Sequence, residues 1–209
     1  MKRQISRKAI VTAITALCVW SSQASAIDSK DGIFNCKIYS QSTTGTKYYL
    51  RHVKDAAPTS VLGVLKYTRD ANKASKFAFT RKDKWKHDYE GTMYYMTTGP
   101  NGGCVGLPAS VTRQAPGVRI QTGWNCGEFD SKRVVVEYFD NNQLVFRVGS
   151  SALFFDGWGG LKEGNDLRTN SPFSGFGVNQ RFRTSGCRAA DNGGHRPKGG
   201  TNKLFPGRK

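Results

Sequence analysis

The stretch "GVRIQTGWNCG", residues 117–127, is the most informative in the chain. Apolar and polar residues alternate over 118–122, which is typical of a β-strand with one buried face. Trp124 then stands two residues before Cys126. An aromatic ring at such a position either packs in the core of a small disulfide-bonded β-protein or forms a surface platform for a ligand. The remainder of the sequence has to distinguish these two roles.

Short alternating segments of the same kind run through most of the chain, and turn residues such as Gly, Asn, Asp and Pro separate them. No segment shows a helical apolar face over three turns. The pattern predicts an all-β fold with about a dozen short strands. The clearest expected strands cover residues 47–53, 75–79, 92–98, 117–122, 133–139, 143–148 and 152–155.

A weak internal repeat indicates how these strands are arranged. "GTKYYL" at 45–50 and "GTMYYM" at 91–96 differ at two positions, and "NQLVFR" at 142–147 is a looser copy. Similar residues close the units, at Phe77, Val136 and Phe182. Three units of about 40–50 residues, each with four strands, predict a β-trefoil. The alternative is a β-sandwich, because the third copy is poor.

The two ends of the chain differ in composition from the region between them. Residues 1–26 combine a basic start, an apolar run and the sequence "ASA", which predicts a cleavable signal peptide. We therefore expect a secreted or periplasmic protein of a Gram-negative bacterium. Residues 27–187 form the predicted domain. Residues 188–209 are rich in Gly and basic residues, which predicts a disordered tail.

The charge of the expected mature chain indicates anionic partners. Removal of the leader's four basic residues leaves 28 Lys and Arg against 15 acids, a formal charge of +13. Such a protein is attracted to an anionic cell surface. Export argues against a specific nucleic-acid partner.

Four cysteines remain after the leader, which predicts two disulfides with three possible pairings. They are Cys36, Cys104, Cys126 and Cys187. No Cys/His cluster has the spacing of a metal site, so neither a metal nor another cofactor is expected.

The middle unit resembles the repeat of ricin-B-type β-trefoil lectins, in which a Cys-Leu-Asp strand precedes Trp-x-Cys and Gln-x-Trp. The corresponding sequences are "CVG" at 104–106, "WNC" at 124–126 and, in the third unit, "QRF" at 180–182. Exported, degenerate units of this kind also resemble the lectin-like subunits of cytolethal distending toxins. The resemblance implies a bond between Cys104 and Cys126. Cys36 and Cys187 are left to join the two ends of the repeated region.

A lectin of this type needs a carboxylate, an aromatic ring and an amide in each working unit. The resemblance implies that Asp156, Trp158 and Asn170 supply them in the third unit. Gly106 replaces the carboxylate in the middle unit, so Trp124 is a weaker carbohydrate-binding candidate and a better core residue. The alternative for "DGWGG" at 156–160 is a turn in which the Asp caps its own backbone.

The first unit lacks a sugar site, since His52 stands at the expected carboxylate position. A basic segment after it, "RKDKWKHDYEG" at 81–91, mixes aromatic and cationic side chains. We expect it to contact an acidic glycan or a lipid head group; the alternative is a solvated loop with its aromatic rings folded back. The contact residues would be Lys84, Trp85, Lys86 and Tyr89.

No nucleophile, metalloprotease or phosphate-binding motif occurs, so the chain is not expected to be an enzyme. The sequence predicts an exported protein that binds a glycan or glycoconjugate as the cell-binding or accessory subunit of a toxin. Its partners would then include the toxin's catalytic subunit. The alternatives are a trefoil that binds or inhibits another protein, and a basic envelope protein that binds polyanions.

Overall fold

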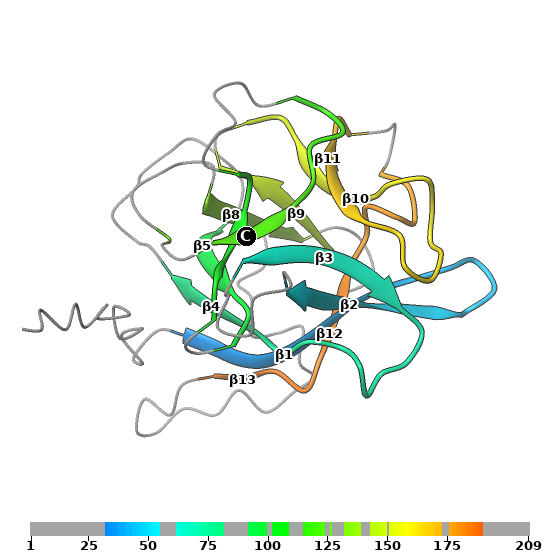
Figure 1. Ribbon diagram of the computed structural model, residues 1–209, viewed down its shortest axis with the longest axis horizontal. Coiled ribbons are helices and arrows are strands. Elements are labelled where there is room, and N and C mark those ends of the chain that lie inside the picture. Colours follow the sequence, from blue (N-terminus) through cyan, green and yellow to red (C-terminus); the bar gives the residue numbers. More distant parts are fainter. Residues whose placement is uncertain are drawn as a thin grey trace, which may run out of the picture.

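A computed structural model describes residues 32–54, 62–81, 92–99, 102–108, 115–123, 126, 132–138, 143–149, 151–172 and 176–189. Within these ranges the regular structure consists of β-strands, without an α-helix (Figure 1). The all-β prediction from the alternating pattern is therefore confirmed.

The strands of the described ranges fall into three consecutive groups of four, followed by one short strand. The first group is β1 (Gly32–Gln41), β2 (Lys47–Lys54), β3 (Gly63–Thr68) and β4 (Phe77–Arg81). The second is β5 (Thr92–Thr97), β6 (Cys104–Gly106), β7 (Gln121–Gly123) and β8 (Arg133–Tyr138). The third is β9 (Leu144–Val148), β10 (Phe154–Gly157), β11 (Leu167–Asn170) and β12 (Arg183–Ser185), and β13 (Arg188–Ala189) ends the series.

The first and fourth strands of each group form a closed antiparallel barrel. β1 pairs with β4, β4 with β5, β5 with β8 and β8 with β9. The circle closes because β12 pairs with β1, while Leu144 at the start of β9 bonds to Phe182 just before β12. Closure removes the free strand edges that an open sheet would expose.

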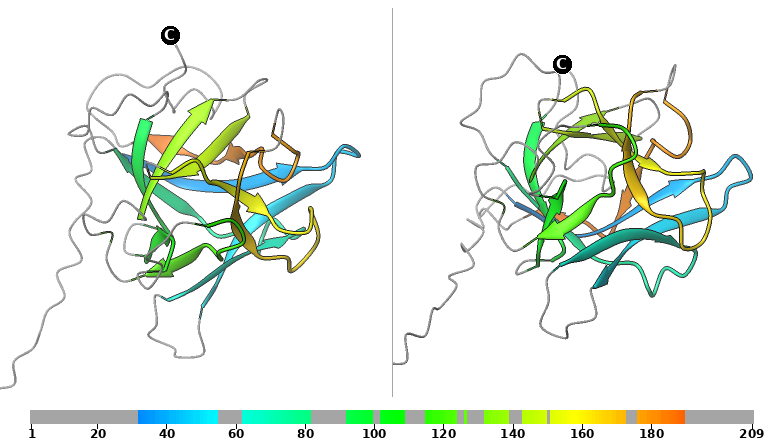
Figure 2. Two further views of the ribbon diagram at one scale, coloured as in Figure 1. Left: turned by 90° about the horizontal axis from the view of Figure 1, so that it is seen from above. Right: turned by 45° about the horizontal axis from the view of Figure 1, so that its top comes forward.

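The second and third strands of each group form a hairpin, and the three hairpins meet on one side of the barrel (Figure 2). β3 of the first hairpin pairs with β7 of the second. The third hairpin reaches the first through the bridge between Lys66 and Asp166, and the second through the bridge between Arg119 and Arg168. Each hairpin therefore contacts both of the others.

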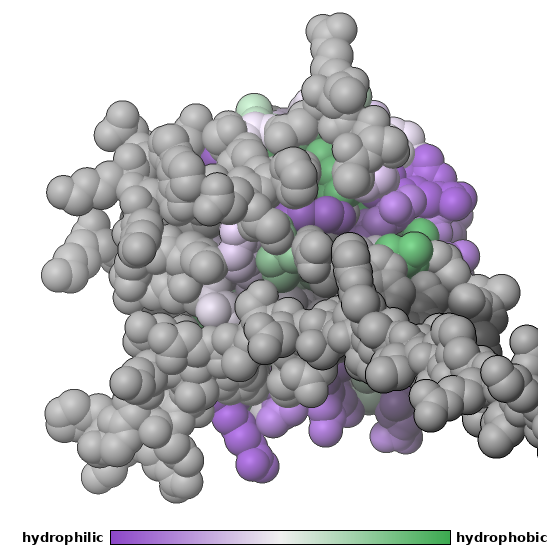
Figure 3. All heavy atoms as spheres, turned by 60° about the vertical axis from the view of Figure 1, so that its left-hand side comes forward, coloured by the Kyte–Doolittle hydropathy of each residue, from purple (hydrophilic) through white to green (hydrophobic). Residues whose placement is uncertain are grey.

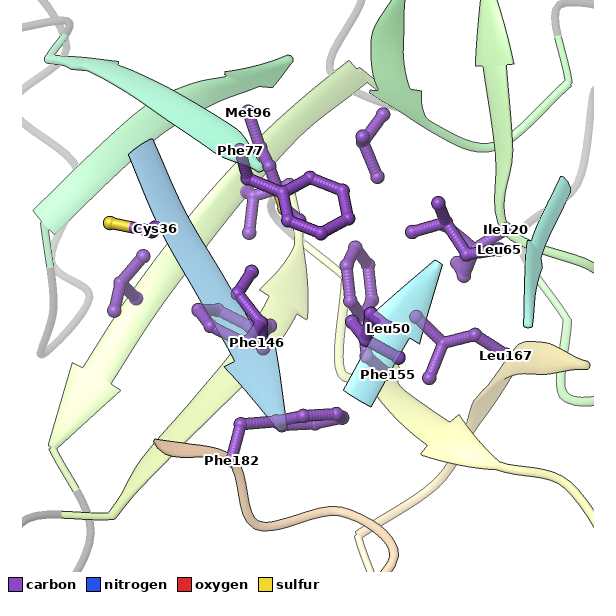
Figure 4. Packing of buried hydrophobic residues seen from close by; sticks show 14 of the residues in the cluster. Cys36, Leu50, Leu65, Phe77, Met96, Ile120, Phe146, Phe155, Leu167 and Phe182 are labelled. Carbon is purple, nitrogen blue, oxygen red and sulfur yellow. The ribbon is translucent and has the colours of Figure 1, made fainter. Parts of the chain in front are cut away.

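Aromatic side chains from all three groups fill the interior (Figure 4). The ring of Phe146 lies 6.0, 5.8 and 5.0 Å from the rings of Phe79, Phe155 and Phe182. Complete burial of one such side chain stabilises the fold by about 1.5–3 kcal/mol. On the side of the molecule seen in Figure 3, hydrophilic side chains predominate among the described residues, and hydrophobic ones form small separate areas.

Three buried aliphatic residues mark equivalent positions in the three hairpins. The amide of Leu65 donates to the carbonyl of Ile120 at 3.3 Å, and the amide of Ile120 donates to the carbonyl of Leu167 at 2.9 Å. All three side chains are fully buried and belong to the same core cluster (Figure 4). The hairpins can therefore be aligned residue by residue on these positions.

The structural alignment corrects the repeat inferred from the sequence. "GTKYYL" overlaps the start of β2, whereas "GTMYYM" overlaps β5 and "NQLVFR" overlaps β9. The last two segments occupy first strands of their groups and are equivalent, but the first lies in a second strand. The closer sequence match thus relates two non-equivalent strands. Two adjacent Tyr residues suit any half-buried strand, so their recurrence does not identify equivalent strands. Val136 in β8 and Phe77 in β4 do lie in the fourth strands, as expected.

Both disulfides inferred from the lectin resemblance are present. Cys36 in β1 bonds to Cys187, which lies between β12 and β13, and Cys104 in β6 bonds to Cys126. The first bond spans 151 residues of sequence and fastens the end of the fold to its first strand. β13 lies within the segment 188–209 that the sequence assigns to the tail.

We expect the two disulfides to contribute unequally to stability. In the chain-entropy model, closing loops of 151 and 22 residues stabilises the folded state by about 5 and about 3 kcal/mol. The double variant Cys36→Ala/Cys187→Ala should therefore lose more unfolding free energy in urea than Cys104→Ala/Cys126→Ala, its matched control. A larger loss in the control pair would contradict this ranking.

Candidate functional site

The third hairpin, β10 with β11, carries the candidate site on its outward face. Phe155 and Thr169 form a directly opposed pair and are buried in the barrel interior. Because side chains alternate along a strand, Asp156 and its partner Arg168 lie on the opposite face, together with Asn170. A polar surface therefore lies directly behind the aromatic core.

Asp156 is buried although it lies on the outward face, with 1% of its surface exposed. The side-chain amide of Asn179 donates to its Oδ1 at 2.9 Å, and that of Asn170 donates to its Oδ2 at 3.4 Å. Gln180 also forms a side-chain hydrogen bond with it. We call Asp156, Asn170, Asn179 and Gln180 the amide cluster. Its carboxylate holds amides from two separate segments in place.

Burial raises the pKa of the Asp156 carboxyl group, because the charged form loses its hydration. The hydrogen bonds from Asn179, Asn170 and Gln180 favour the carboxylate and lower the pKa, but the effect of burial is larger. Asp156 therefore takes up its proton at a higher pH than an ordinary aspartate.

Trp158 begins the turn between β10 and β11, and hydrogen bonds fix its backbone. Its amide donates to the carbonyl of Asp166 at 3.3 Å. The side chain of Asn165 donates to the carbonyls of Trp158 and Gly160, both at 3.0 Å. Trp158 remains 41% exposed, so hydrogen bonds to its backbone fix an exposed aromatic residue on this turn.

The indole of Trp158 lies against residues of two units. The guanidinium of Arg168 lies 5.4 Å from the ring centroid, a cation–π distance. A Cβ atom added to Gly117 would approach the ring to 3.4 Å, and Gly117 itself has a positive φ of 84°. Arg168 also donates to the carbonyl of Gly117 at 3.4 Å. The first residue of "GVRIQTGWNCG" thus lies close to a ring from the next unit, and a side chain there would meet that ring.

The third unit alone has a carboxylate at this position of the hairpin. Asp156 pairs with Arg168, Gly106 pairs with Gln121 and Arg51 pairs with Lys66. Each of these partners directly follows one of the three aligned core residues, so Asp156, Gly106 and Arg51 are equivalent.

The first-unit position is therefore Arg51, and its assignment to His52 was off by one residue. His52 instead faces Thr122, with 2.9 Å between its Nε2 and the threonine hydroxyl.

The structure places the predicted third-unit residues on one hairpin but not in one contact. Asn170 donates a hydrogen bond to Asp156, whereas the ring of Trp158 lies near Gly117 and Arg168. The other predicted contact residues lie outside the described residues and stay predictions: Trp124, Trp85, Lys84, Lys86 and Tyr89.

Asn179 is not among the residues predicted from the sequence, although it donates the shorter hydrogen bond to Asp156. A signal for it existed, because it directly precedes the Gln-x-aromatic motif at 180–182.

No group of three or more His, Cys, Asp or Glu side chains in the described ranges is placed to hold a metal ion. No helix in the same ranges is long and apolar enough to cross a membrane.

Comparison with known proteins identifies the fold. No protein-family model matches the sequence, and no curated protein matches it. The designed three-fold symmetric protein ThreeFoil superposes with a TM-score of 0.52 at 15% identity, covering 73% of this chain and 96% of that one. The fold is a β-trefoil. The trefoil prediction is thus confirmed and the β-sandwich alternative is wrong.

A natural lectin shares the trefoil arrangement. The Polyporus squamosus lectin, solved with a human-type influenza-binding epitope, matches with a TM-score of 0.50 at 11% identity. The match covers 74% of this chain and 48% of the lectin, so the chain spans about half of that protein.

The raised pKa of Asp156 predicts a pH dependence of stability. Below the ordinary aspartate pKa, both the folded and the unfolded chain hold this proton. As the pH rises from there through the higher folded-state value, the unfolded chain releases the proton first and the unfolding free energy falls.

Urea unfolding over a pH series should show this decrease, and Asp156→Asn should remove it, because an asparagine does not titrate. The difference between the two proteins isolates Asp156 from the other acids. A difference that is constant with pH would contradict the assignment.

Proposed function

We propose that this trefoil binds carbohydrate on the outward face of its third hairpin. The observation that carries the proposal is the amide cluster, in which a buried carboxylate fixes amide groups next to the turn that carries the exposed Trp158. Saccharides present hydroxyl groups together with apolar C–H faces. Oriented amides suit the hydroxyl groups, and an exposed aromatic ring suits the apolar face.

The geometry supports distinct roles for the residues of this face. Trp158 stacks against a sugar ring, and the amides of Asn170 and Asn179 hydrogen-bond to its hydroxyl groups. Asp156 is a positioning residue, since it is buried and both of its oxygens already accept hydrogen bonds.

The lectin resemblance implies that Asp156 accepts hydrogen bonds directly from sugar hydroxyl groups. Because Asp156 is buried beneath the amides, one amide has to move before a sugar can reach it. Asn170 is the better candidate to move, because its 3.4 Å contact with Asp156 is longer than the 2.9 Å contact of Asn179. A ligand hydroxyl group would then replace the Asn170 amide at Oδ2.

The wider role that we propose follows from the ends and the charge of the chain. The leader at residues 1–26 supports export to the periplasm or the exterior, and the formal charge of +13 on the remainder supports attachment to an anionic cell surface. A non-enzymatic cell-binding or accessory subunit of a toxin fits these properties. The Polyporus squamosus lectin, which was solved with a bound epitope, supports carbohydrate as the ligand class.

A glycan array followed by calorimetric titration of the best ligand tests the proposal. Trp158→Ala should lower the affinity about tenfold or more, which corresponds to about 1.4 kcal/mol. Leu62→Ala removes a similarly exposed apolar side chain from the first hairpin and should leave the affinity unchanged. Absence of binding to every glycan by the folded protein would refute the proposal, and an effect of Leu62→Ala equal to that of Trp158→Ala would refute the choice of hairpin.

Asn170→Ala separates the two modes of recognition. If the Asn170 amide itself contacts the sugar, the affinity should fall. If Asp156 accepts the hydroxyl groups directly, removing its competitor should maintain or raise the affinity. Because we assign Asn170 a direct contact, we expect a several-fold loss in the same titration, and an increase would contradict that assignment.

A further inference from the structure

Three cations from three different units converge on one carboxylate where the hairpins meet. Asp166 receives the Nε of Arg119 at 2.8 Å and the Nη2 of Arg168 at 3.4 Å on its Oδ2, and the Nζ of Lys66 at 3.5 Å on its Oδ1. Lys66 belongs to the first unit, Arg119 to the second, and Arg168 and Asp166 to the third. We call these four residues the hairpin junction.

The core forces these charges together. Leu65, Ile120 and Leu167 are buried, and backbone hydrogen bonds link Leu65 to Ile120 and Ile120 to Leu167. Each charged residue of the junction is the chain neighbour of one of them, and alternation along a strand sends neighbours to opposite faces. The backbone bridges Lys66–Asp166 and Arg119–Arg168 then bring the outward side chains together.

Asp166 organises the junction without neutralising it. The junction has three positive charges and one negative charge, and in the described ranges no second carboxylate forms an ion pair with its cations. The Asp166 side chain is only 12% exposed, whereas that of Arg119 is 54% exposed. The carboxylate therefore lies beneath the cationic side chains, and it orders them while they remain open to solvent. Arg119 uses Nε for this contact, one of the five N–H donors of an arginine.

The hairpin junction is continuous with the surface to which we assign carbohydrate binding. Arg168 belongs to the junction, lies over the indole of Trp158, and is the direct cross-strand partner of Asp156. The order along the outward face of the third hairpin is therefore amide cluster, Arg168 with the indole, and junction. A ligand stacked on Trp158 would have hydroxyl-binding groups on one side and cations on the other.

We propose that the hairpin junction binds an oxyanion substituent, a sulfate or a carboxylate, so that the ligand of this trefoil is an acidic saccharide. This inference rests on the proposed carbohydrate-binding function and adds the class of saccharide. Arginine favours sulfate and carboxylate because its planar fork can donate two parallel hydrogen bonds to two oxygens. A carboxylate that already orders the cations lowers the entropy that they lose on binding.

The shape of the charged surface favours an acidic saccharide over a nucleic acid. The junction concentrates three cations at one point, whereas a polynucleotide engages a succession of phosphates along its backbone. An acidic saccharide has one or two oxyanions beside a sugar ring. That arrangement matches a compact cluster of cations next to amide groups and an indole.

Calorimetric titration with N-acetyllactosamine oligomers tests the inference, using the neutral, the sulfated and the sialylated forms of the same core. We expect an acidic form to bind about tenfold more tightly than the neutral form at low salt, with the difference shrinking as salt is added. Comparison of the sulfated and sialylated forms shows which oxyanion the junction prefers.

Arg119→Gln should remove the preference for the acidic form and leave the affinity for the neutral form unchanged. Lys73→Gln is the matched control, because Lys73 is also an exposed cation paired with a carboxylate, that of Asp70, and it should preserve the preference. Lys66→Gln provides a second junction variant, and thermal melting shows that each variant is folded.

The possible failures can be told apart. Equal binding of neutral and acidic forms, with no effect of Arg119→Gln, would overturn the acidic-saccharide inference and leave the proposed function intact. Binding of single-stranded DNA or phosphatidylserine vesicles as tightly as the acidic form, with loss in Arg119→Gln, would overturn it in favour of a general polyanion site. Absence of binding to every saccharide would refute the proposed function itself.

Discussion

The contact of the three hairpins through Leu65, Ile120 and Leu167 is the constraint on which the outward surface depends. Backbone hydrogen bonds link these residues across the units, and their side chains are buried together. Whatever follows or precedes them in the sequence must therefore face outward at the same place. The convergence of Lys66 and Arg119 on Asp166 is a geometric result of this packing.

Inner and outer positions of the hairpins obey different requirements. Leu50, Val105 and Phe155 are equivalent, and all are apolar and fully buried. The next residue along the strand, which faces outward, is Arg51 in the first unit but Asp156 in the third. The barrel requires apolar side chains from every unit, whereas the outward position differs from unit to unit. A trefoil can therefore keep its fold while a single unit carries a polar site.

The sequence predicts the local features of this fold better than its tertiary contacts. Alternation predicts the strands because it reports burial directly. The pairing of Cys104 with Cys126 was implied by the resemblance to ricin-type lectins, and Cys36 and Cys187 were then left to pair with each other. The Tyr-Tyr repeat misleads, since β2 and β5 are both half-buried strands that accept such a pair. Asp156 could be chosen from its motif, but its burial beneath Asn179 depends on how the chain returns after β11.

The hairpin junction could not be predicted from the sequence for the same reason, because it depends on the register between units. The contact between Gly117 and the indole of Trp158 is likewise set by that register, and it has a consequence for modularity. The ring belongs to the third repeat, but the neighbouring backbone belongs to the second. A third repeat excised from the chain, or grafted onto another trefoil, would carry the indole without the backbone of Gly117 that lies next to it. The surface to which we assign carbohydrate binding thus depends on two adjacent repeats, and one repeat alone does not contain all of it.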